Sequence, residues 1–121
     1  MRAIAITEPG GPEVLVAEDR AKPEPKAGEI LIKVHAAGVN RPDCMQRAGN
    51  YPPPPGAPDI PGLEVAGEVE AIGDQVTSWQ VGDQVCALVP GGGYAEYCIA
   101  DARNALPVPR GLTMTEAAAI P

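Results

Sequence analysis

The chain has 121 residues, with nine Lys and Arg against sixteen Asp and Glu, which gives a net charge of −7. No cluster of basic residues interrupts this acidic balance, so we expect neither nucleic acid nor an anionic membrane as a partner, because both are bound through basic surfaces. No apolar run approaches the roughly 18 residues of a membrane span, and no signal peptide is recognisable at the start. We therefore expect a soluble, cytoplasmic protein.

The composition predicts a single, mainly β domain. Glycine (14) and proline (15) are abundant, Phe is absent, and aromatic residues make up only 3%. Such a turn-rich chain with an Ala, Val, Ile and Leu core is typical of a small barrel or sandwich built from many short strands. Cys44, Cys86 and Cys98 are odd in number and widely spaced, so we expect reduced, buried thiols and no zinc ribbon.

Alternating apolar residues between turn signals predict a series of short strands. The first two runs, with a Pro- and Gly-rich turn between them, indicate a hairpin, and we expect the strand at 94–100 to pair with the one at 83–89. Together they predict a small closed or half-closed barrel. The predicted strands are 2–7, 14–17, 29–39, 65–72, 83–89, 94–100 and 105–108.

One histidine is present, His35, and it falls on the same face of the 29–39 strand as Lys33. A solvated imidazole is favoured there over a metal ligand or a catalytic base, because the face that alternates with it carries the apolar residues.

A short helix is predicted between Asn40 and Gly49, because Asn40 suits the N-cap, Pro42 and Asp43 suit the first turn, and Gly49 suits the position after the end. Asn40 allows two compatible interpretations. It caps the helix, or it presents a carboxamide, both donor and acceptor, to a polar ligand at the mouth of the barrel. A second helix begins at the capping box of Thr113 and Glu116, and we expect such a start to belong to a longer chain.

Tyr51 precedes four consecutive prolines, 52–55. It can pack its ring against those prolines, form part of a polyproline ligand for SH3- or WW-type modules, or present its phenol to a carbonyl substrate. The sequence leaves all three open.

The glycine-rich stretches do not predict a phosphate-binding loop. The 62–67 stretch has the outer spacing of a P-loop but lacks the Lys and Ser or Thr that should follow it, and 91–93 precedes a predicted strand. If a nucleotide binds, most of its site lies outside these residues.

Five motifs, taken together and in this order, resemble the medium-chain dehydrogenase/reductase superfamily, and in particular its zinc-free quinone oxidoreductase branch, the relatives of zeta-crystallin. They lie at 38–43, 61–67, 81–85, 92–97 and 115–121. The resemblance implies that residues 1–121 form a mainly β, GroES-like, partly open β-barrel with short helices. In that superfamily this is the catalytic domain of a two-domain enzyme, and the NADPH-binding Rossmann domain that normally follows is missing from this chain.

The resemblance also implies a function and a site. Residues 1–121 would be the substrate-binding half of a zinc-independent, NADPH-dependent quinone or α,β-unsaturated carbonyl reductase, inactive as this fragment and a homodimer at full length. Tyr51 and Asn40 would be catalytic, and Asn40 and Asp43 would contribute to cofactor binding. The alternative is a free-standing GroES-like binding or scaffold module without catalysis.

No metal is implied. Zinc-dependent members of the superfamily have a cysteine at the position of Asn40, a histidine at that of Leu63 and a four-cysteine lobe near 90–94, and this chain has none of these. Glu64 matches a family carboxylate, for which a structural ion pair is an equally good interpretation.

Overall fold

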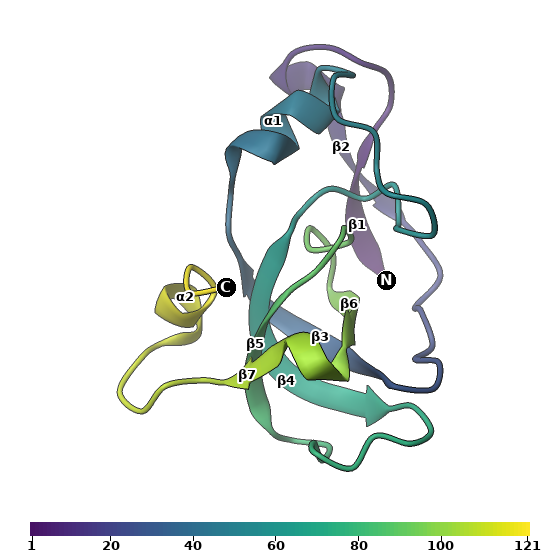
Figure 1. Cartoon of the computed structure of the whole chain (residues 1–121). Coiled ribbons are helices and arrows are strands. Elements are labelled where there is room, and N and C mark those ends of the chain that lie inside the picture. The colour runs from purple at the N-terminus through teal and green to yellow at the C-terminus, as the bar shows by residue number, and fades with distance from the viewer.

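The computed structural model describes all residues from Met1 to Pro121, and it contains two antiparallel sheets and few helices. Figure 1 shows the two-stranded sheet beside α1 in the upper part of the molecule and the five-stranded sheet below them. The predicted mainly β fold is confirmed. The elements are β1 (Arg2–Ile6), η1 (Pro12–Val14), β2 (Leu15–Asp19), β3 (Glu29–Ala37), α1 (Arg41–Arg47), β4 (Glu64–Ile72), β5 (Gln84–Leu88), β6 (Tyr97–Asp101), η2 (Ala102–Asn104), β7 (Ala105–Pro107) and α2 (Met114–Ala117).

The first two strands form the predicted hairpin. β1 and β2 pair in antiparallel fashion from Arg2 opposite Asp19 to Ile6 opposite Leu15. The hairpin reaches the larger sheet through one isolated bridge, between Ala3 and Ala95, and the N–H of Ile4 donates to the Tyr94 carbonyl at 2.8 Å. The hairpin is therefore an appendage of the barrel, attached beside Tyr94.

The five-stranded sheet has the order β6-β3-β4-β5-β7, and its two edge strands leave the barrel open on one side. The predicted pairing of the 94–100 strand with the 83–89 strand is wrong, because β6 pairs with β3, whereas β5 lies between β4 and β7. The reason lies in the glycine turn before β6. The N–H groups of Gly93 and Tyr94 donate to the carbonyls of Gly62 and Pro61, and this crossing carries the chain to the far edge of the sheet.

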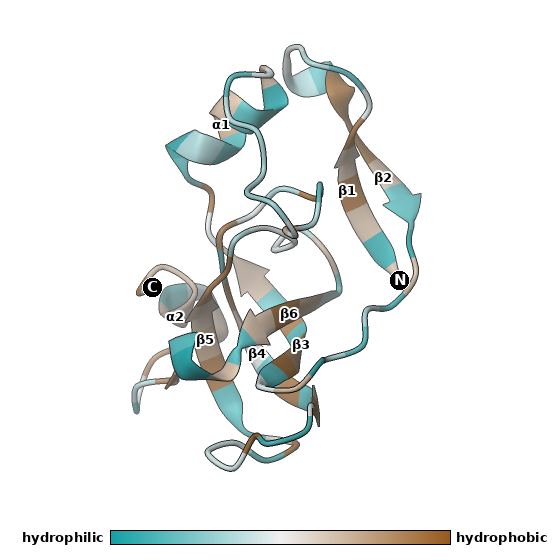
Figure 2. Ribbon diagram, turned by 45° about the vertical axis from the view of Figure 1, so that its right-hand side comes forward, coloured by the Kyte–Doolittle hydropathy of each residue, from teal (hydrophilic) through white to brown (hydrophobic).

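Two clusters of apolar side chains hold the sheet. The larger one lies inside the half-barrel and includes Ile30, Ile32, Val65 and Val85. The smaller one lies between the sheet and α2, where Ala117 and Ala118 pack on Ala66 and Cys86. Figure 2 shows that the most apolar segments lie on the strands, whereas the connections are mostly polar. No helix has the length and apolar character needed to cross a membrane.

Several local predictions can be compared with the structure. Cys86 and Cys98 are buried as expected, but Cys44 is exposed, because α1 buries only its residue Asp43. His35 is exposed on β3, as predicted. The capping box of Thr113 and Glu116 is confirmed at the start of α2.

Candidate functional site

The candidate site is built around the first turn of α1. Asn40 has extended backbone angles and occupies the N-cap, as predicted, and Pro lies in the first turn of the helix. The N–H of Asp43 donates to the main-chain oxygen of Asn40 at 3.0 Å, and the N–H of Asn40 donates back to Asp43 Oδ2 at 2.9 Å. The Asn40 side chain lies toward the N3 amide but makes no aligned cap hydrogen bond. The carboxylate of Asp43, rather than the amide of Asn40, therefore closes this helix end.

Asp43 joins three segments that are far apart in the sequence. The residue is only 6% exposed. Oδ1 accepts from the N–H of Gly62 at 3.3 Å, and Oδ2 also accepts from the hydroxyl of Tyr94 at 2.6 Å. Burial raises the pKa of the Tyr94 phenol, and the hydrogen bond to Asp43 and its negative charge raise it further. Tyr94 is therefore a neutral donor to a buried carboxylate, and the pair holds α1 against the barrel.

The approach of Tyr94 depends on Gly62. Gly62 has a φ of +106°, and a Cβ built on it would lie 2.7 Å from Gly93 Cα and from the main-chain nitrogen of Tyr94. Only glycine combines this left-handed backbone with so close a crossing.

Glu64, the first residue of β4, holds the side chain of Asn40. Asn40 Nδ2 donates to Glu64 Oε1 at 2.9 Å. Glu64 is 7% exposed, and none of the five ion pairs of the chain includes it or Asp43. The structural ion pair, one of the two interpretations of Glu64 given above, is therefore wrong, and the partner of Glu64 is a neutral amide. The site joins a carboxamide, two carboxylates and a phenol without a cation.

Tyr51 lies apart from this network. It follows α1, is half-buried and makes no hydrogen bond with its side chain, while the prolines at 52–55 are exposed. The N–H of Ala57 donates to the Pro54 carbonyl at 3.0 Å, so a turn ends the extended stretch after a few residues. The half-buried Tyr51 and this early turn do not favour a polyproline ligand.

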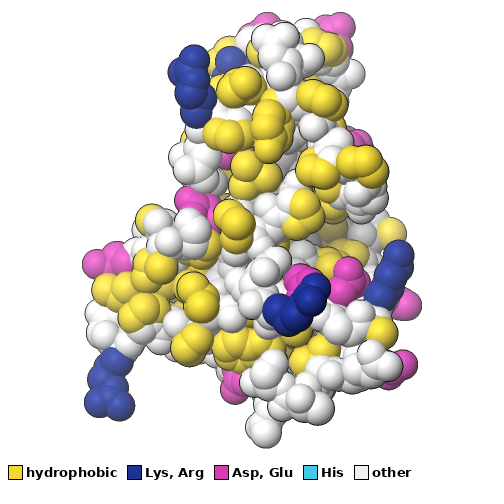
Figure 3. Space-filling view, in the orientation of Figure 1, with side chains coloured by type: hydrophobic (Ala, Val, Ile, Leu, Met, Phe, Trp, Pro, Cys, Tyr) yellow, Lys and Arg dark blue, Asp and Glu magenta, His cyan; other side chains and the backbone are white.

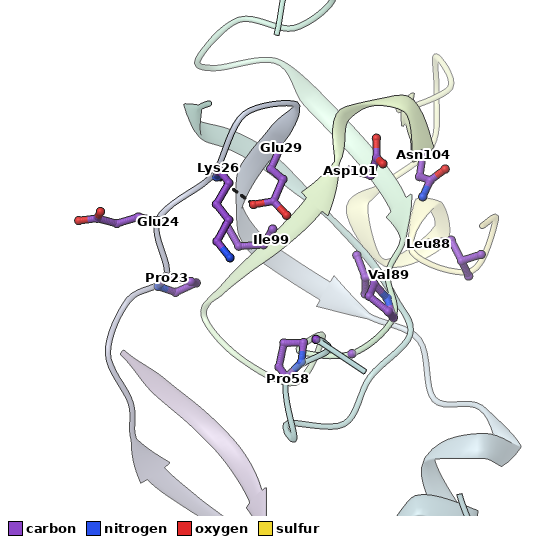
Figure 4. A pocket seen from close by; sticks show the side chains of 13 residues that line it. Pro23, Glu24, Lys26, Glu29, Pro58, Leu88, Val89, Ile99, Asp101 and Asn104 are labelled. Atoms are coloured by element: carbon purple, nitrogen blue, oxygen red, sulfur yellow. Dashed lines mark hydrogen bonds between the residues drawn. The ribbon is translucent and has the colours of Figure 1, made fainter. Parts of the chain in front are cut away.

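The largest cavity, of about 610 Å³, lies elsewhere. It opens on the unclosed side of the half-barrel, between Ile99 and Asp101 of β6 and the segment that carries Leu88 and Val89 (Figure 4). Neither Asn40 nor Tyr51 lines it. Of the residues expected to meet substrate, Asn40 thus lies at the start of α1 and Tyr51 after its end, both outside this cavity.

No group of three His, Cys, Asp or Glu side chains is placed to hold a metal ion. At the two positions named above, Asn40 turns its NH₂ group toward Glu64, and Leu63 has no donor atom. The donor set here is therefore unsuited to a tetrahedral zinc site, which takes nitrogen, sulfur or carboxylate ligands.

The sequence reasoning missed Tyr94 as a site residue. It lies inside the 92–97 motif, but nothing local shows that its hydroxyl reaches Asp43, which is 51 positions earlier in the chain. The signal was the glycine triplet before it, because consecutive glycines permit the close crossing that aims the ring at α1.

Comparison with known proteins identifies this fold. Residues 26–110 match the alcohol dehydrogenase GroES-like domain family. The chain belongs to this family. The GroES-like fold and the resemblance to the medium-chain dehydrogenase/reductase superfamily are confirmed.

Named relatives of this GroES-like domain agree with that assignment. The chain is 43% identical to mouse quinone oxidoreductase, over 99% of the chain and 37% of that protein. Its structure superposes on the human synaptic vesicle membrane protein VAT-1 homolog-like protein with a TM-score of 0.92, at 40% identity over 100% of the chain and 39% of that structure. With Escherichia coli quinone oxidoreductase complexed with NADPH, the TM-score is 0.90 at 33% identity, over 99% and 37%. The GroES-like domain thus spans little more than a third of these relatives.

Proposed function

We propose that this GroES-like domain is the substrate-binding half of a zinc-independent reductase that transfers hydride or electrons from NADPH to a quinone or an α,β-unsaturated carbonyl. In this proposal it acts together with a dinucleotide-binding Rossmann domain in a longer, cytoplasmic, homodimeric protein. The named relatives support the reaction class, since several are quinone oxidoreductases. Quinones and enones are small uncharged molecules, so the net charge of −7 is no obstacle to binding them. Figure 3 shows one face on which acidic and basic side chains are scattered among apolar ones.

The observation that carries the proposal is the fixed carboxamide of Asn40. Asn40 is half-buried, and one of the two N–H groups of its Nδ2 donates a hydrogen bond to Glu64. One N–H is left for a ligand, together with the side of the carbonyl oxygen that does not face the Asp43 amide. This neutral amide suits the nicotinamide end of NADPH or the carbonyl oxygen of a substrate. Both of these ligand groups are uncharged, so the protein needs no opposite charge to bind them.

The residues of this chain fit only that end of NADPH. When bound, NADPH supplies the hydride or the electrons of the reaction. Asn40 would orient its nicotinamide end, and Asp43 would act through the main chain of Asn40, whose N–H it holds at 2.9 Å. The chain has no glycine-rich loop before a helix for the phosphates, so we assign them to the Rossmann domain. We therefore expect these 121 residues alone to be inactive.

In the same proposal no zinc takes part, and Tyr51 serves the substrate. The amide and the leucine that occupy the family's metal-ligand positions support the first point. For the second, Tyr51 has no hydrogen-bond partner within the chain, so its phenol is free to donate to a quinone or enone oxygen. A donor at that oxygen stabilises the negative charge that develops during reduction.

The direct test compares two forms of the protein, the 121-residue chain and a form extended through a dinucleotide-binding domain. NADPH binding is measured by titration of its fluorescence, and 1,2-naphthoquinone reduction by loss of NADPH absorbance. We expect binding and reduction in the extended form only, with no dependence on added zinc or on a chelator.

Two results would contradict the proposal. If the extended form neither binds NADPH nor reduces the quinone, the reductase assignment fails and the domain is better studied as a binding module. If a chelator abolishes the activity and zinc restores it, the zinc-independent part fails.

A further inference from the structure

A buried carboxylate without a cation needs an explanation, and Glu64 is such a group. It is 7% exposed, makes no ion pair, and has one side-chain hydrogen-bond partner, Asn40 Nδ2 at 2.9 Å. Burying a charge costs stability unless it is compensated. A leucine or glutamine would fill the same space without the cost of burying a charge. The feature to explain is therefore the carboxylate of Glu64 and not the volume of its side chain.

The backbone makes room for this carboxylate. A Cβ built on Gly38 would overlap Glu64 Oε1, Cδ and Cγ. The N–H of Gly38 also donates to the main-chain oxygen of Glu64 at 3.1 Å. Gly38 follows β3 and precedes Asn40 by two positions, so the missing side chain lets Glu64 reach across that segment to the amide.

An ionised carboxylate can only accept hydrogen bonds, whereas an asparagine amide has one accepting and one donating end. Facing Glu64, the amide must turn its NH₂ group inward, which places its oxygen on the other side. We propose that Glu64 is a positioning residue that holds the Asn40 carboxamide in a single orientation for the ligand. This inference rests on the proposed function, in which Asn40 touches cofactor or substrate.

The orientation determines which ligand group fits. One N–H of Nδ2 remains, as does the Oδ1 lone pair that does not face the Asp43 amide, so the amide matches a ligand group that offers an acceptor and a donor side by side. If the Asn40 amide were flipped, its oxygen would take the place of Nδ2, and the N–H would no longer point to the ligand. A preorganised group of this kind loses no binding free energy to reorientation when the ligand arrives.

Two reciprocal substitutions test the polarity of the pair. Asn40→Asp places two carboxylates at hydrogen-bond distance, and they cannot both be ionised without repulsion. We expect its melting temperature to fall by about 5 °C or more. Adding Glu64→Gln places an amide at position 64 that can donate to the new carboxylate at position 40, so the double variant regains most of the stability of the 121-residue chain.

Ligand binding separates positioning from mere packing. In the extended form the double variant has a hydrogen-bonded pair but no N–H to offer, so we expect NADPH affinity to stay at least about ten-fold weaker than in the wild type. Glu64→Gln alone keeps an acceptor but allows both amide orientations. For it we expect a second, or broadened, set of Asn40 side-chain amide signals in ¹⁵N spectra of the 121-residue chain.

Matched controls are Glu68→Gln, on the same strand, and Asn104→Asp, both at residues whose side chains make no hydrogen bond within the chain. Neither should change the melting temperature or the Asn40 signals. The inference is overturned if the double variant regains affinity together with stability, or if Glu64→Gln leaves a single unchanged Asn40 amide. Should the extended wild type not bind NADPH, the proposed function fails, while the Asn40 signals still decide whether Glu64 fixes the amide.

Discussion

Removing one oxygen atom from Tyr94 should measurably loosen α1 from the barrel. The Tyr94 hydroxyl donates to Asp43 Oδ2 at 2.6 Å, and Asp43 is only 6% exposed. Tyr94→Phe leaves the ring in place and leaves the N–H groups of Asn40 and Gly62 on the carboxylate. A hydrogen bond to a charged group contributes about 1.5–3 kcal/mol, so we expect that loss in free energy of unfolding, or a melting temperature lower by about 6–12 °C for a chain of this length.

The assay is urea unfolding at neutral pH, followed by the fluorescence of Trp79, the single tryptophan. Tyr97→Phe is the matched control, because the Tyr97 ring lies under Lys22 and its hydroxyl makes no hydrogen bond within the chain. If Tyr94→Phe and Tyr97→Phe differ by less than about 0.5 kcal/mol, the account of Asp43 as the link between α1 and the barrel is refuted.

The same pair predicts an alkaline effect. The pKa of Tyr94 is raised in the folded protein by burial and by Asp43, whereas an unfolded tyrosine ionises near pH 10. A raised folded pKa favours folding below the unfolded pKa, and that contribution is lost as the pH rises above about 10. Tyr94→Phe should lack this part of the pH dependence, and an identical alkaline profile in both proteins would contradict it.

Three further results are expected. Gly62→Ala should lower the free energy of unfolding by at least about 2 kcal/mol, because the φ of +106° at Gly62 and the crossing at Gly93 exclude a Cβ. Urea unfolding measures this loss, and a loss under about 0.5 kcal/mol would contradict the close crossing. Burial raises the pKa of the Cys98 thiol to about 12, so stability should fall as the pH rises above about 9. Cys98→Ala should flatten that slope by about 1.4 kcal/mol per pH unit near pH 10, and an unchanged slope would show that the thiol is not buried. Hydrogen bonds from Arg103 lower the pKa of Asp101 to about 2, a stabilisation present above the unfolded pKa and lost as the pH falls toward 2. Because the pair is exposed, Arg103→Ala should change the stability only slightly, but the Asp101 pKa should rise in NMR titrations, and an unmoved pKa would contradict the pairing.

The elements that depend on local pattern were predictable. The hairpin of β1 and β2, the long strand β3 and both helix starts follow from alternation, turn residues and capping residues within a few positions. Asn40 and Asp43 were placed at the helix start for the same reason, since an N-cap and a first-turn acid are local signals, whereas their roles in a site were implied by the family resemblance.

The features that depend on distant segments were not predictable. The placement of β6 beside β3 and the bond from Tyr94 to Asp43 both arise where Gly93 crosses Gly62, and no local pattern encodes which glycines meet. For Glu64 the sequence left a family carboxylate and a structural ion pair as alternatives. The partner of Glu64 is instead the amide of Asn40, which reaches it because Gly38 leaves the space open.

The central claim is that Asn40 and Tyr51 of this domain serve an NADPH-dependent reductase. Its most direct test is kcat/KM for 1,2-naphthoquinone in the extended protein, measured for the wild type, Asn40→Ala, Tyr51→Phe and the surface control Asn104→Asp. We predict that both site variants lose about ten-fold or more while the control is unchanged. Reduction at the wild-type rate in both site variants would contradict the claim.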